Sequence, residues 1–308
     1  MNILIALGGN ALLQRGEPLE AETQRINIKK VAEVVNKISE EHNVIITHGN
    51  GPQVGLLALQ NLNYKETKPY PLDVLGAESS GMIGYMLIQE LSNELGIYDQ
   101  SVVNVITRTL VDKNDPAFNN PTKFIGPVYN KQESEEMKSK YGWEIKADGE
   151  YYRRVVPSPK PKKIIETNVI KELLEKKHIV VCGGGGGVPT IIENEKYKGV
   201  EAVIDKDLTS SLLAQELGVD AFIILTDVSC VYENYKQEDQ KMIKHFPIFE
   251  FDENSYPDGS MLPKIKAAVD FSINNEGFSS IGKLEELEDI INKKSGTIFD
   301  TLFEKSYY

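Results

Sequence analysis

The chain has 308 residues, and its 34 basic and 46 acidic side chains give a formal net charge of −12. A chain of this length forms one large α/β domain or two ordinary domains, with a core that needs no disulfide bond or structural metal. The acidic balance disfavours a nucleic-acid partner, and the apolar runs are far shorter than the roughly 20 residues that cross a bilayer. Two cysteines in apolar stretches, Cys182 and Cys230, favour a reducing cytoplasm over a secreted disulfide framework.

Short β-branched runs alternate with segments of helical periodicity along the chain. The runs predict strands at residues 3–7, 44–47, 102–107, 179–182 and 221–225. Apolar residues three or four positions apart predict helices around residues 28–38, 83–95, 165–173, 208–217 and 260–273. Asp207 or Thr209 is expected to cap the fourth of these helices, and Ser260 to open the fifth. The alternation predicts an α/β domain with a mostly parallel sheet.

The segment from about residue 116 to 161 breaks this alternation. It is rich in proline and aromatic residues and has no long periodic segment. Because it is too long for a loop in a compact domain, we predict a subdomain inserted into a single domain of residues 1–308.

Glycine clusters mark four turns. Three follow predicted strands, at residues 8–9, 49–55 and 183–187, and a fourth at Gly259 leads into the last predicted helix. Glycine lets a phosphate approach the backbone, and a following helix N-terminus adds free N–H donors. Such loops gather at the carboxyl ends of parallel strands, which predicts a site for a phosphorylated ligand there.

The common phosphate-binding motifs are missing from the sequence. There is no Gly-Lys-Ser/Thr of a Walker loop, and Gly49, Gly51 and Gly55 are spaced one residue too widely for a dinucleotide fingerprint. His-Arg-Asp and Asp-Phe-Gly triplets are also absent. A P-loop ATPase, a dinucleotide dehydrogenase and a protein kinase are therefore all disfavoured.

Charged residues near these turns suit phosphoryl chemistry but leave alternatives open. Lys206 can neutralise a transferring phosphoryl group, with Asp207 organising lysines or Mg²⁺, or the pair can be a surface charge and a helix cap. Asp227 either supports a phosphate site or caps a turn. Tyr232 and Tyr235 either flank an adenine ring or lie on the surface. The four histidines have no metal-like spacing, and His48 is more typical of a structural hydrogen-bonder than of a base.

Together the motifs resemble those of carbamate kinase, a family of the amino-acid kinase superfamily. The resemblance covers residues 3–298, and it is carried by Ala-Leu-Gly-Gly-Asn-Ala-Leu at 6–12, Thr-His-Gly-Asn-Gly-Pro-Gln-Val-Gly at 47–55, Val-Asp-Lys-Asn-Asp-Pro-Ala-Phe at 111–118, Asn-Pro-Thr-Lys at 120–123, Arg-Arg-Val-Val-Pro-Ser-Pro at 153–159, the glycine run with Val-Pro at 183–189, Ala-Val-Ile-Asp-Lys-Asp at 202–207, and Gly-Ser-Met-Leu-Pro-Lys at 259–264.

The resemblance implies an open three-layer αβα sandwich with a small protruding subdomain over the substrate site. It implies reversible phosphoryl transfer between ATP and carbamate, giving ADP and carbamoyl phosphate, used chiefly to make ATP. Mg²⁺ would be required and carried mainly by the nucleotide, with no metal site in the protein. The family also implies a cytoplasmic homodimer.

Site residues carry over from the family position by position. The transferring phosphate and carbamate would be bound by Gly8, Gly9, Asn10, Gly49, Asn50 and Gly51. The catalytic residues would be Lys123, Lys206, Asp207 and Lys264. The nucleotide would contact Asp227, Val228, Tyr232, Met261 and Lys264. Related kinases often have a lysine where this chain has Ala6, so the resemblance assigns the missing cation to Lys123, with Lys113 as a weaker candidate.

Two other functions stay open on the sequence. One is a kinase of the same superfamily acting on acetylglutamate, glutamate or UMP. The other is an ATP-binding sensor that has lost phosphoryl transfer.

Overall fold

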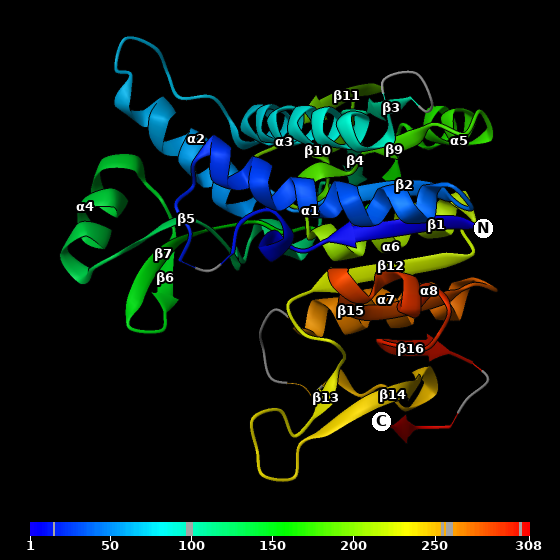
Figure 1. Cartoon of the computed structure of the whole chain (residues 1–308). Coiled ribbons are helices and arrows are strands. Elements are labelled where there is room, and N and C mark those ends of the chain that lie inside the picture. Colours follow the sequence, from blue (N-terminus) through cyan, green and yellow to red (C-terminus); the bar gives the residue numbers. More distant parts are fainter. Residues whose placement is uncertain (15, 97–100, 254–255, 257–260, 302–303) are drawn as a thin grey trace.

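The computed structural model describes residues 1–14, 16–96, 101–253, 256, 261–301 and 304–308 (Figure 1). Within them, ten strands form a central sheet in the order β13-β14-β16-β15-β12-β1-β2-β9-β3, with β17 paired to β14. Their bounds are β1 Asn2–Leu7, β2 Asn43–His48, β3 Val102–Asn104, β9 Ile179–Val181, β12 Ala221–Thr226, β13 Tyr232–Glu233, β14 Lys241–Pro247, β15 Phe278–Lys283, β16 Thr297–Asp300 and β17 Ser306–Tyr307. The run from β15 to β3 is parallel throughout, whereas β16 is antiparallel to β15. The predicted α/β fold with a mostly parallel sheet is confirmed.

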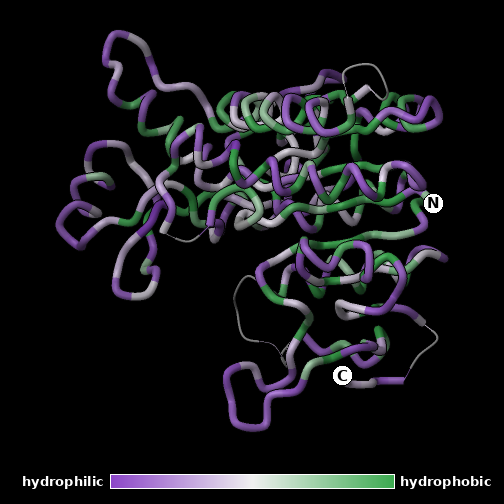
Figure 2. The backbone as a smooth tube through the Cα atoms, in the orientation of Figure 1, coloured by the Kyte–Doolittle hydropathy of each residue, from purple (hydrophilic) through white to green (hydrophobic). Residues whose placement is uncertain are grey.

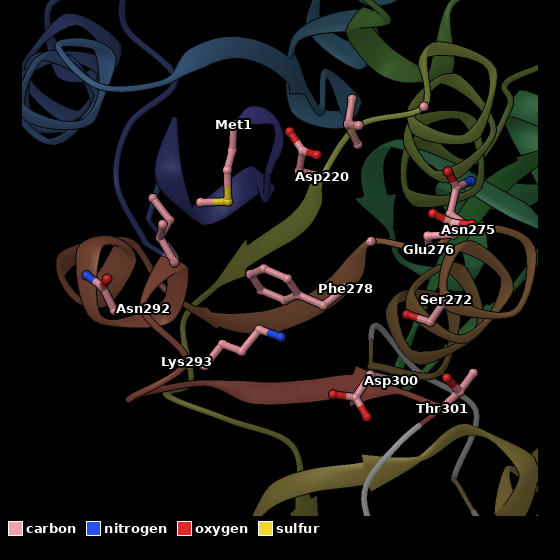
Figure 3. Close-up of a pocket in the computed structure, with 14 residues that line it drawn as sticks. Met1, Asp220, Ser272, Asn275, Glu276, Phe278, Asn292, Lys293, Asp300 and Thr301 are labelled. Atoms are coloured by element: carbon pink, nitrogen blue, oxygen red, sulfur yellow. The ribbon is translucent and has the colours of Figure 1, made fainter.

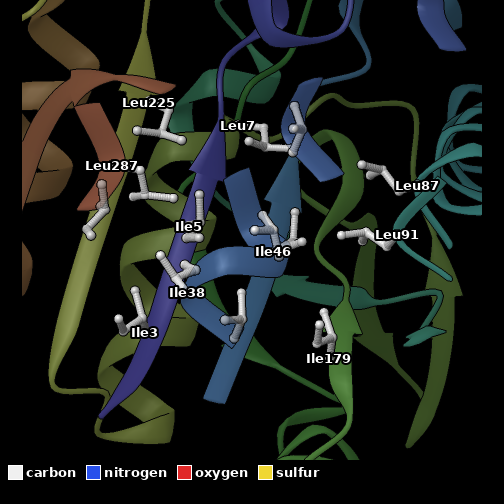
Figure 4. Packing of buried hydrophobic residues seen from close by; sticks show 14 of the residues in the cluster. Ile3, Ile5, Leu7, Ile38, Ile46, Leu87, Leu91, Ile179, Leu225 and Leu287 are labelled. Atoms are coloured by element: carbon white, nitrogen blue, oxygen red, sulfur yellow. The ribbon is translucent and has the colours of Figure 1, made fainter. Parts of the chain in front are cut away.

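Helices cover both faces of this sheet because successive strand residues point to opposite sides. In β1, Ile3, Ile5 and Leu7 join one core, shared with α1 (Ala21–Ser39), α3 (Leu72–Leu95) and α8 (Leu287–Ile291) (Figure 4). Leu4 and Ala6 join the opposite core, shared with α5 (Thr167–Glu175), α6 (Lys206–Leu217) and α7 (Met261–Asn274). The chain therefore folds as three layers, α/β/α.

Two smaller sheets flank the central one. The first, in the order β11-β10-β4-β8, contains β4 Arg108–Val111, β8 Pro161–Ile164, β10 Val188–Glu193 and β11 Lys196–Gly199. The second, β5-β7-β6, contains β5 Lys123–Tyr129, β6 Ile145–Asp148 and β7 Tyr151–Val156. With α4 (Lys131–Tyr141), the second sheet projects from the sandwich beside α2 (Gly51–Asn63) (Figure 1). We call α4 and these three strands the protruding unit.

Some element bounds differ from those predicted. Helix α6 is capped by Asp205, whose side chain accepts from the N–H groups of Asp207 and Leu208, so the predicted cap at Asp207 or Thr209 is wrong. Helix α5 begins at Thr167, and the predicted strand at 102–107 ends at Asn104. The predicted opening residue Ser260 lies outside the described residues.

Hydropathy follows the layers. Figure 2 shows hydrophobic residues concentrated along the central strands and a uniformly hydrophilic loop between β13 and β14. Among the described residues, no helix combines the length and the hydropathy that crossing a membrane requires.

Candidate active site

Two glycine loops meet at the carboxyl edge of the sheet. The Gly8 N–H donates to the carbonyl of Leu225 at 3.0 Å, and a Cβ on Gly8 would lie 2.7 Å from the same oxygen. Gly9, in the short helix Gly9–Ala11, is exposed. A Cβ placed on Gly49 would be 3.9 Å from the Gly9 nitrogen. The loops after β1 and β2 are therefore neighbours, as the sequence predicted.

The second loop runs directly into α2. This helix begins at Gly51, and its N-cap residue Asn50 makes no side-chain capping bond. The first N–H groups of a helix have no intrahelical acceptor, and the dipole adds positive potential at that end. Gly51 is exposed and a Cβ on it would touch nothing within 4 Å. This combination makes the start of α2 an anion-binding surface.

Three charged side chains form a cluster below these loops. The Lys206 Nζ lies 2.6 Å from one carboxylate oxygen of Asp207, and the Lys264 Nζ lies 3.0 Å from the other. The side chains are 12%, 11% and 6% exposed for Lys206, Lys264 and Asp207. Lys206 Nζ also donates to the carbonyl of Leu7 at 3.1 Å, at the end of β1. The cluster is thus fixed to the first glycine loop.

Burial and pairing set the charges of this cluster. Burial alone would raise the pKa of Asp207, but the two ammonium groups hold it well below its usual range. Burial lowers the pKa of Lys206, and its attraction to Asp207 offsets part of that effect. Burial also lowers the pKa of Lys264, but Asp207, Asp205 and Asp227 together outweigh it and raise the pKa overall. Two cations share one anion, which leaves a net positive charge at the site.

A third lysine arrives from the protruding unit. Lys123, the first residue of β5, donates from Nζ to the carboxylate of Asp205 at 2.7 Å. Its side chain is 36% exposed, so Lys123 remains accessible to a ligand. Asp205 is also the cap of α6, whose first two residues are Lys206 and Asp207. All four predicted catalytic residues therefore lie around the start of α6.

Strand β5 is held close to α2 by two glycines. A Cβ on Gly55 would lie 2.6 Å from the Cα of Gly126, so any side chain at residue 55 would prevent this contact. This approach places the strand carrying Lys123 beside α2, whose N-terminus has the free N–H groups described above.

The five-glycine run, residues 183–187, lies against the second loop. All five glycines are buried. A Cβ on Gly184 would lie 2.7 Å from the His48 Nε2, and one on Gly185 would lie 2.1 Å from the Asn50 Nδ2. The run therefore packs behind the second loop and supports it.

His48 belongs to this supporting layer. The ring is buried, and its Nδ1 is 3.0 Å from the carbonyl of Gly49. Burial, with a smaller contribution from Lys206, lowers the pKa of His48 to about 4. The imidazole is neutral at neutral pH, in agreement with the structural role predicted for it.

Comparison with known proteins identifies the fold family. The model of the amino acid kinase family matches residues 1–277. The carbamate kinase of Haemophilus influenzae is 51% identical over 298 residues, covering 96% of each chain. That of Rhizobium meliloti is 48% identical over 306 residues, covering 98% of this chain and 94% of its own. The chain belongs to the amino acid kinase family.

A solved structure of the same family supports the assignment at the level of the backbone. Carbamate kinase from Giardia lamblia bound to AMP-PNP superposes with a TM-score of 0.90 at 40% identity, over 97% of this chain and 98% of its own. The motif resemblance and the predicted fold class are both confirmed.

The residues that the sequence predicted to bind nucleotide lie farther along the carboxyl edge of the central sheet. Asp227 follows β12 and is exposed, and its charge acts on Lys264. Val228 is half-buried beside it, and the Tyr232 ring lies 5.5 Å from that of Tyr235. Met261 is the first residue of α7, one turn before Lys264. The structure thus brings Asp227 and Lys264 together, and it places Val228 and Tyr232 in the segment that follows.

A few residues predicted from the sequence lie outside the described part of the structure or away from the lysine cluster. Gly259 is outside the described residues, and so is the side chain of Asn10. Asn50 turns its amide toward Ser79 at 2.9 Å, so its side chain fixes the loop. Lys113 is exposed in the turn after β4, near Glu193 of β10, and not with the other lysines.

Sequence reasoning gave no role to Asp205 and Ser79. Asp205 holds Lys123, and Ser79 of α3 holds Asn50. An N-cap signal was available for Asp205, since Asp before a helical segment is a preferred cap. Nothing local marks Ser79, because its partner is 29 residues away in the chain.

A cavity of about 820 Å³ lies at the other end of the strands, where the chain enters β1, β12 and β15 (Figure 3). It is lined by residues that precede β1, β12 and β15, among them Met1, Asp220 and Gly277. The candidate active site follows the carboxyl ends of β1, β2 and β12. The two features are therefore separate.

Proposed function

We propose that this protein transfers a phosphoryl group reversibly between ATP and carbamate. A carbamate oxygen attacks the γ-phosphorus of ATP, the bond from that phosphorus to the ADP oxygen breaks, and carbamoyl phosphate forms. The reverse reaction makes ATP from ADP and carbamoyl phosphate. The Haemophilus influenzae carbamate kinase, at 51% identity, supports the choice of substrate.

One observation carries the proposal. Three lysines from separate elements, Lys123, Lys206 and Lys264, meet at the start of α6, beside two glycine loops. Two carboxylates pair with them, so the group carries a net charge of about +1. Such a site attracts an anion.

The chemistry explains why no base is required. Carbamate is already an anion with a nucleophilic oxygen, so the barrier arises from bringing two anions together in line. Fixed ammonium groups and backbone N–H groups neutralise charge as it redistributes in the transition state. Lys206 faces the first loop, Lys264 the nucleotide side near Asp227, and Lys123 the carbamate side.

Mg²⁺ fits this site as a partner of the nucleotide. The described residues contain no group of three or more His, Cys, Asp or Glu side chains placed to hold a metal ion. Mg²⁺ commonly keeps several waters and binds through substrate phosphates with one or two carboxylates. When bound, it would offset charge on the phosphate oxygens, and Asp227 is the carboxylate best placed to face it.

The alternatives differ in measurable ways. A kinase acting on acetylglutamate, glutamate or UMP would phosphorylate its own acceptor and would leave carbamoyl phosphate intact. A nucleotide sensor would bind ADP without making ATP. The lysine cluster favours transfer over sensing, since binding alone does not require three lysines around one phosphoryl position.

The test is ATP formation by the purified protein. We expect ADP, Mg²⁺ and carbamoyl phosphate together to give ATP, which a luminescence assay measures. Acetyl phosphate as the phosphoryl donor should give far less ATP. Bound ADP without ATP formation would identify a sensor. Phosphorylation of UMP, glutamate or acetylglutamate by ATP, with carbamoyl phosphate unused, would identify a different kinase.

The family relationship also supports a homodimer that makes ATP from carbamoyl phosphate. The cytoplasmic location expected from the cysteines stays a prediction.

A further inference from the structure

Asp205 links two parts of the molecule that are far apart in sequence. One carboxylate oxygen, Oδ1, accepts from the N–H of Asp207 at 2.9 Å and from that of Leu208 at 3.3 Å. The other, Oδ2, accepts from the Lys123 Nζ at 2.7 Å. The side chain is 17% exposed, so these bonds are partly shielded from water.

The two oxygens have separable tasks. The bonds to Oδ1 satisfy N–H groups at the start of α6 and so fix the backbone of Lys206 and Asp207. The bond to Oδ2 fixes the ammonium group of Lys123, which has two further N–H donors for a ligand. One side chain thus sets the distance between a lysine of the protruding unit and the lysine cluster of the core.

No other described ion pair provides this link. The other described ion pair between the protruding unit and the rest of the chain joins Arg154 to Glu201 at 3.7 Å, and Glu201 precedes α6 by five residues. That pair orients the unit without touching any of the three site lysines. The position of the Lys123 ammonium group therefore depends on Asp205.

We propose that Asp205 is a positioning residue for phosphoryl transfer, which holds Lys123 in register with Lys206 and Lys264. This inference rests on the proposed function. Asp205 touches neither substrate nor nucleotide in this account and acts through Lys123. A misplacement of about 1 Å in such a group costs on the order of 100-fold in rate.

The asparagine variant separates the two tasks. Asparagine caps helices about as well as aspartate, so Asp205→Asn keeps the bonds from α6 and removes the charge that holds Lys123. We expect a melting temperature close to that of the wild type, a loss of about 10- to 100-fold in kcat/KM for carbamoyl phosphate, and a KM for ADP changed by less than about twofold. Asp205→Ala loses the cap as well, so its melting temperature should fall.

A double-mutant cycle with Lys123→Ala tests whether Asp205 acts through that lysine. Once Lys123 is absent, Asp205→Asn should cause no further loss of activity, because interacting residues are non-additive. Losses that multiply in the double variant would overturn the proposal. Wild-type kinetics in Asp205→Asn would also overturn the proposal. So would an Asp205→Asn protein that binds ADP and carbamoyl phosphate more weakly by the same factor.

A competing explanation predicts the opposite effect of Asp205→Asn on the use of carbamoyl phosphate. If Asp205 served only to offset positive charge, Asp205→Asn would bind carbamoyl phosphate more tightly, and that result would also overturn the proposal. Failure of the proposed function is distinguishable from each of these results, because the wild-type protein would then make no ATP.

Discussion

At the scale of single residues, the stability of the site depends on Asp207. It is the only described carboxylate paired with Lys206 or Lys264, and all three side chains are nearly buried. A buried charge is costly when it loses its partner, whereas an exposed ion pair contributes little. The same pairing that concentrates positive charge for the substrate therefore makes the fold dependent on one carboxylate.

We predict that Asp207→Ala lowers the free energy of unfolding by about 3–5 kcal/mol, because two buried ammonium groups lose the carboxylate that they contact directly. Urea denaturation at neutral pH measures this change. The matched control is Glu193→Ala, which removes an exposed pair with Lys198 at 2.8 Å and should have a much smaller effect. Equal losses in the two variants would contradict the prediction.

His48 gives the fold a defined acid sensitivity. The folded protein holds the pKa of His48 at about 4, against an ordinary value of 6.5. Between these values the unfolded chain binds a proton that the folded chain excludes, so the contribution is complete above pH 6.5 and is lost as the pH falls toward 4. The loss amounts to about 3 kcal/mol.

We predict that His48→Gln flattens the decline of stability between pH 6.5 and 4, because glutamine does not titrate. Urea denaturation at several pH values compares the slopes of the two proteins. The absolute stability of the variant can differ from that of the wild type without affecting this comparison. A slope identical to that of the wild type would show that folding does not lower the pKa of His48.

At the scale of elements, the sequence predicted best where the pattern of apolar residues is strong. The buried strands β1, β2 and β12 were located within a residue or two, because a parallel sheet covered on both faces is a run of apolar residues. Helix α4 was missed because it has little apolar periodicity. Its stability comes instead from a capping box of Asn130 and Glu133 and from Gly142 in the left-handed conformation.

The site elements divide in the same way. Glycine loops after strands, and a lysine near a helix start, are local signals and were recognised. The meeting of Lys123 with Asp205 spans 82 residues and depends on how the protruding unit packs on α2. No local pattern contains that information. The burial of the five-glycine run was not predictable either, since glycine spacing does not tell an open anion loop from one packed against side chains.

That packing role is testable by substitution in the run. Gly185→Ala should abolish most activity, because its Cβ would lie 2.1 Å from the Asn50 amide and displace the second loop. Gly218→Ala is a matched control: its φ of 61° is close to the 63° of Gly185, but a Cβ there touches nothing within 4 Å. The control shares the backbone strain, of about 1–2 kcal/mol, without the clash.

Steady-state ATP formation and thermal melting distinguish the two variants. We expect both to melt at a lower temperature and only Gly185→Ala to lose turnover. Equal turnover in the two variants would mean that the run does not support the second loop.

At the scale of the whole molecule, an apolar stripe on α3 is the best candidate for the interface of the proposed homodimer. Val74 and Tyr85 are 42% and 56% exposed, with Gly81 between them on the same helix face. Ile106 is 42% exposed and lies against this stripe, 3.8 Å from a Cβ placed on Gly81. Exposed apolar surface of this kind is typical of a contact with another chain.

We predict a mass of about 69 kDa in solution, twice the 34.5 kDa of one chain. Ile106→Asp should shift the protein toward the monomer, because a carboxylate buried at the interface without a partner is unfavourable. Light scattering after size-exclusion chromatography measures both. Phe249→Asp, at another exposed apolar residue, is the control and should remain dimeric. A dimer unaffected by Ile106→Asp would place the interface elsewhere.

The most direct test of the account compares wild-type protein with Lys123→Ala in ATP formation from ADP and carbamoyl phosphate, with ADP binding measured in parallel. Lys123 is 36% exposed, so the variant should fold normally. We predict unchanged ADP binding and a loss of about 10²–10³ in turnover, because one fixed donor to the transferring group is missing. Turnover close to that of the wild type would contradict the claim that the lysines of the protruding unit and the core form one phosphoryl-transfer site.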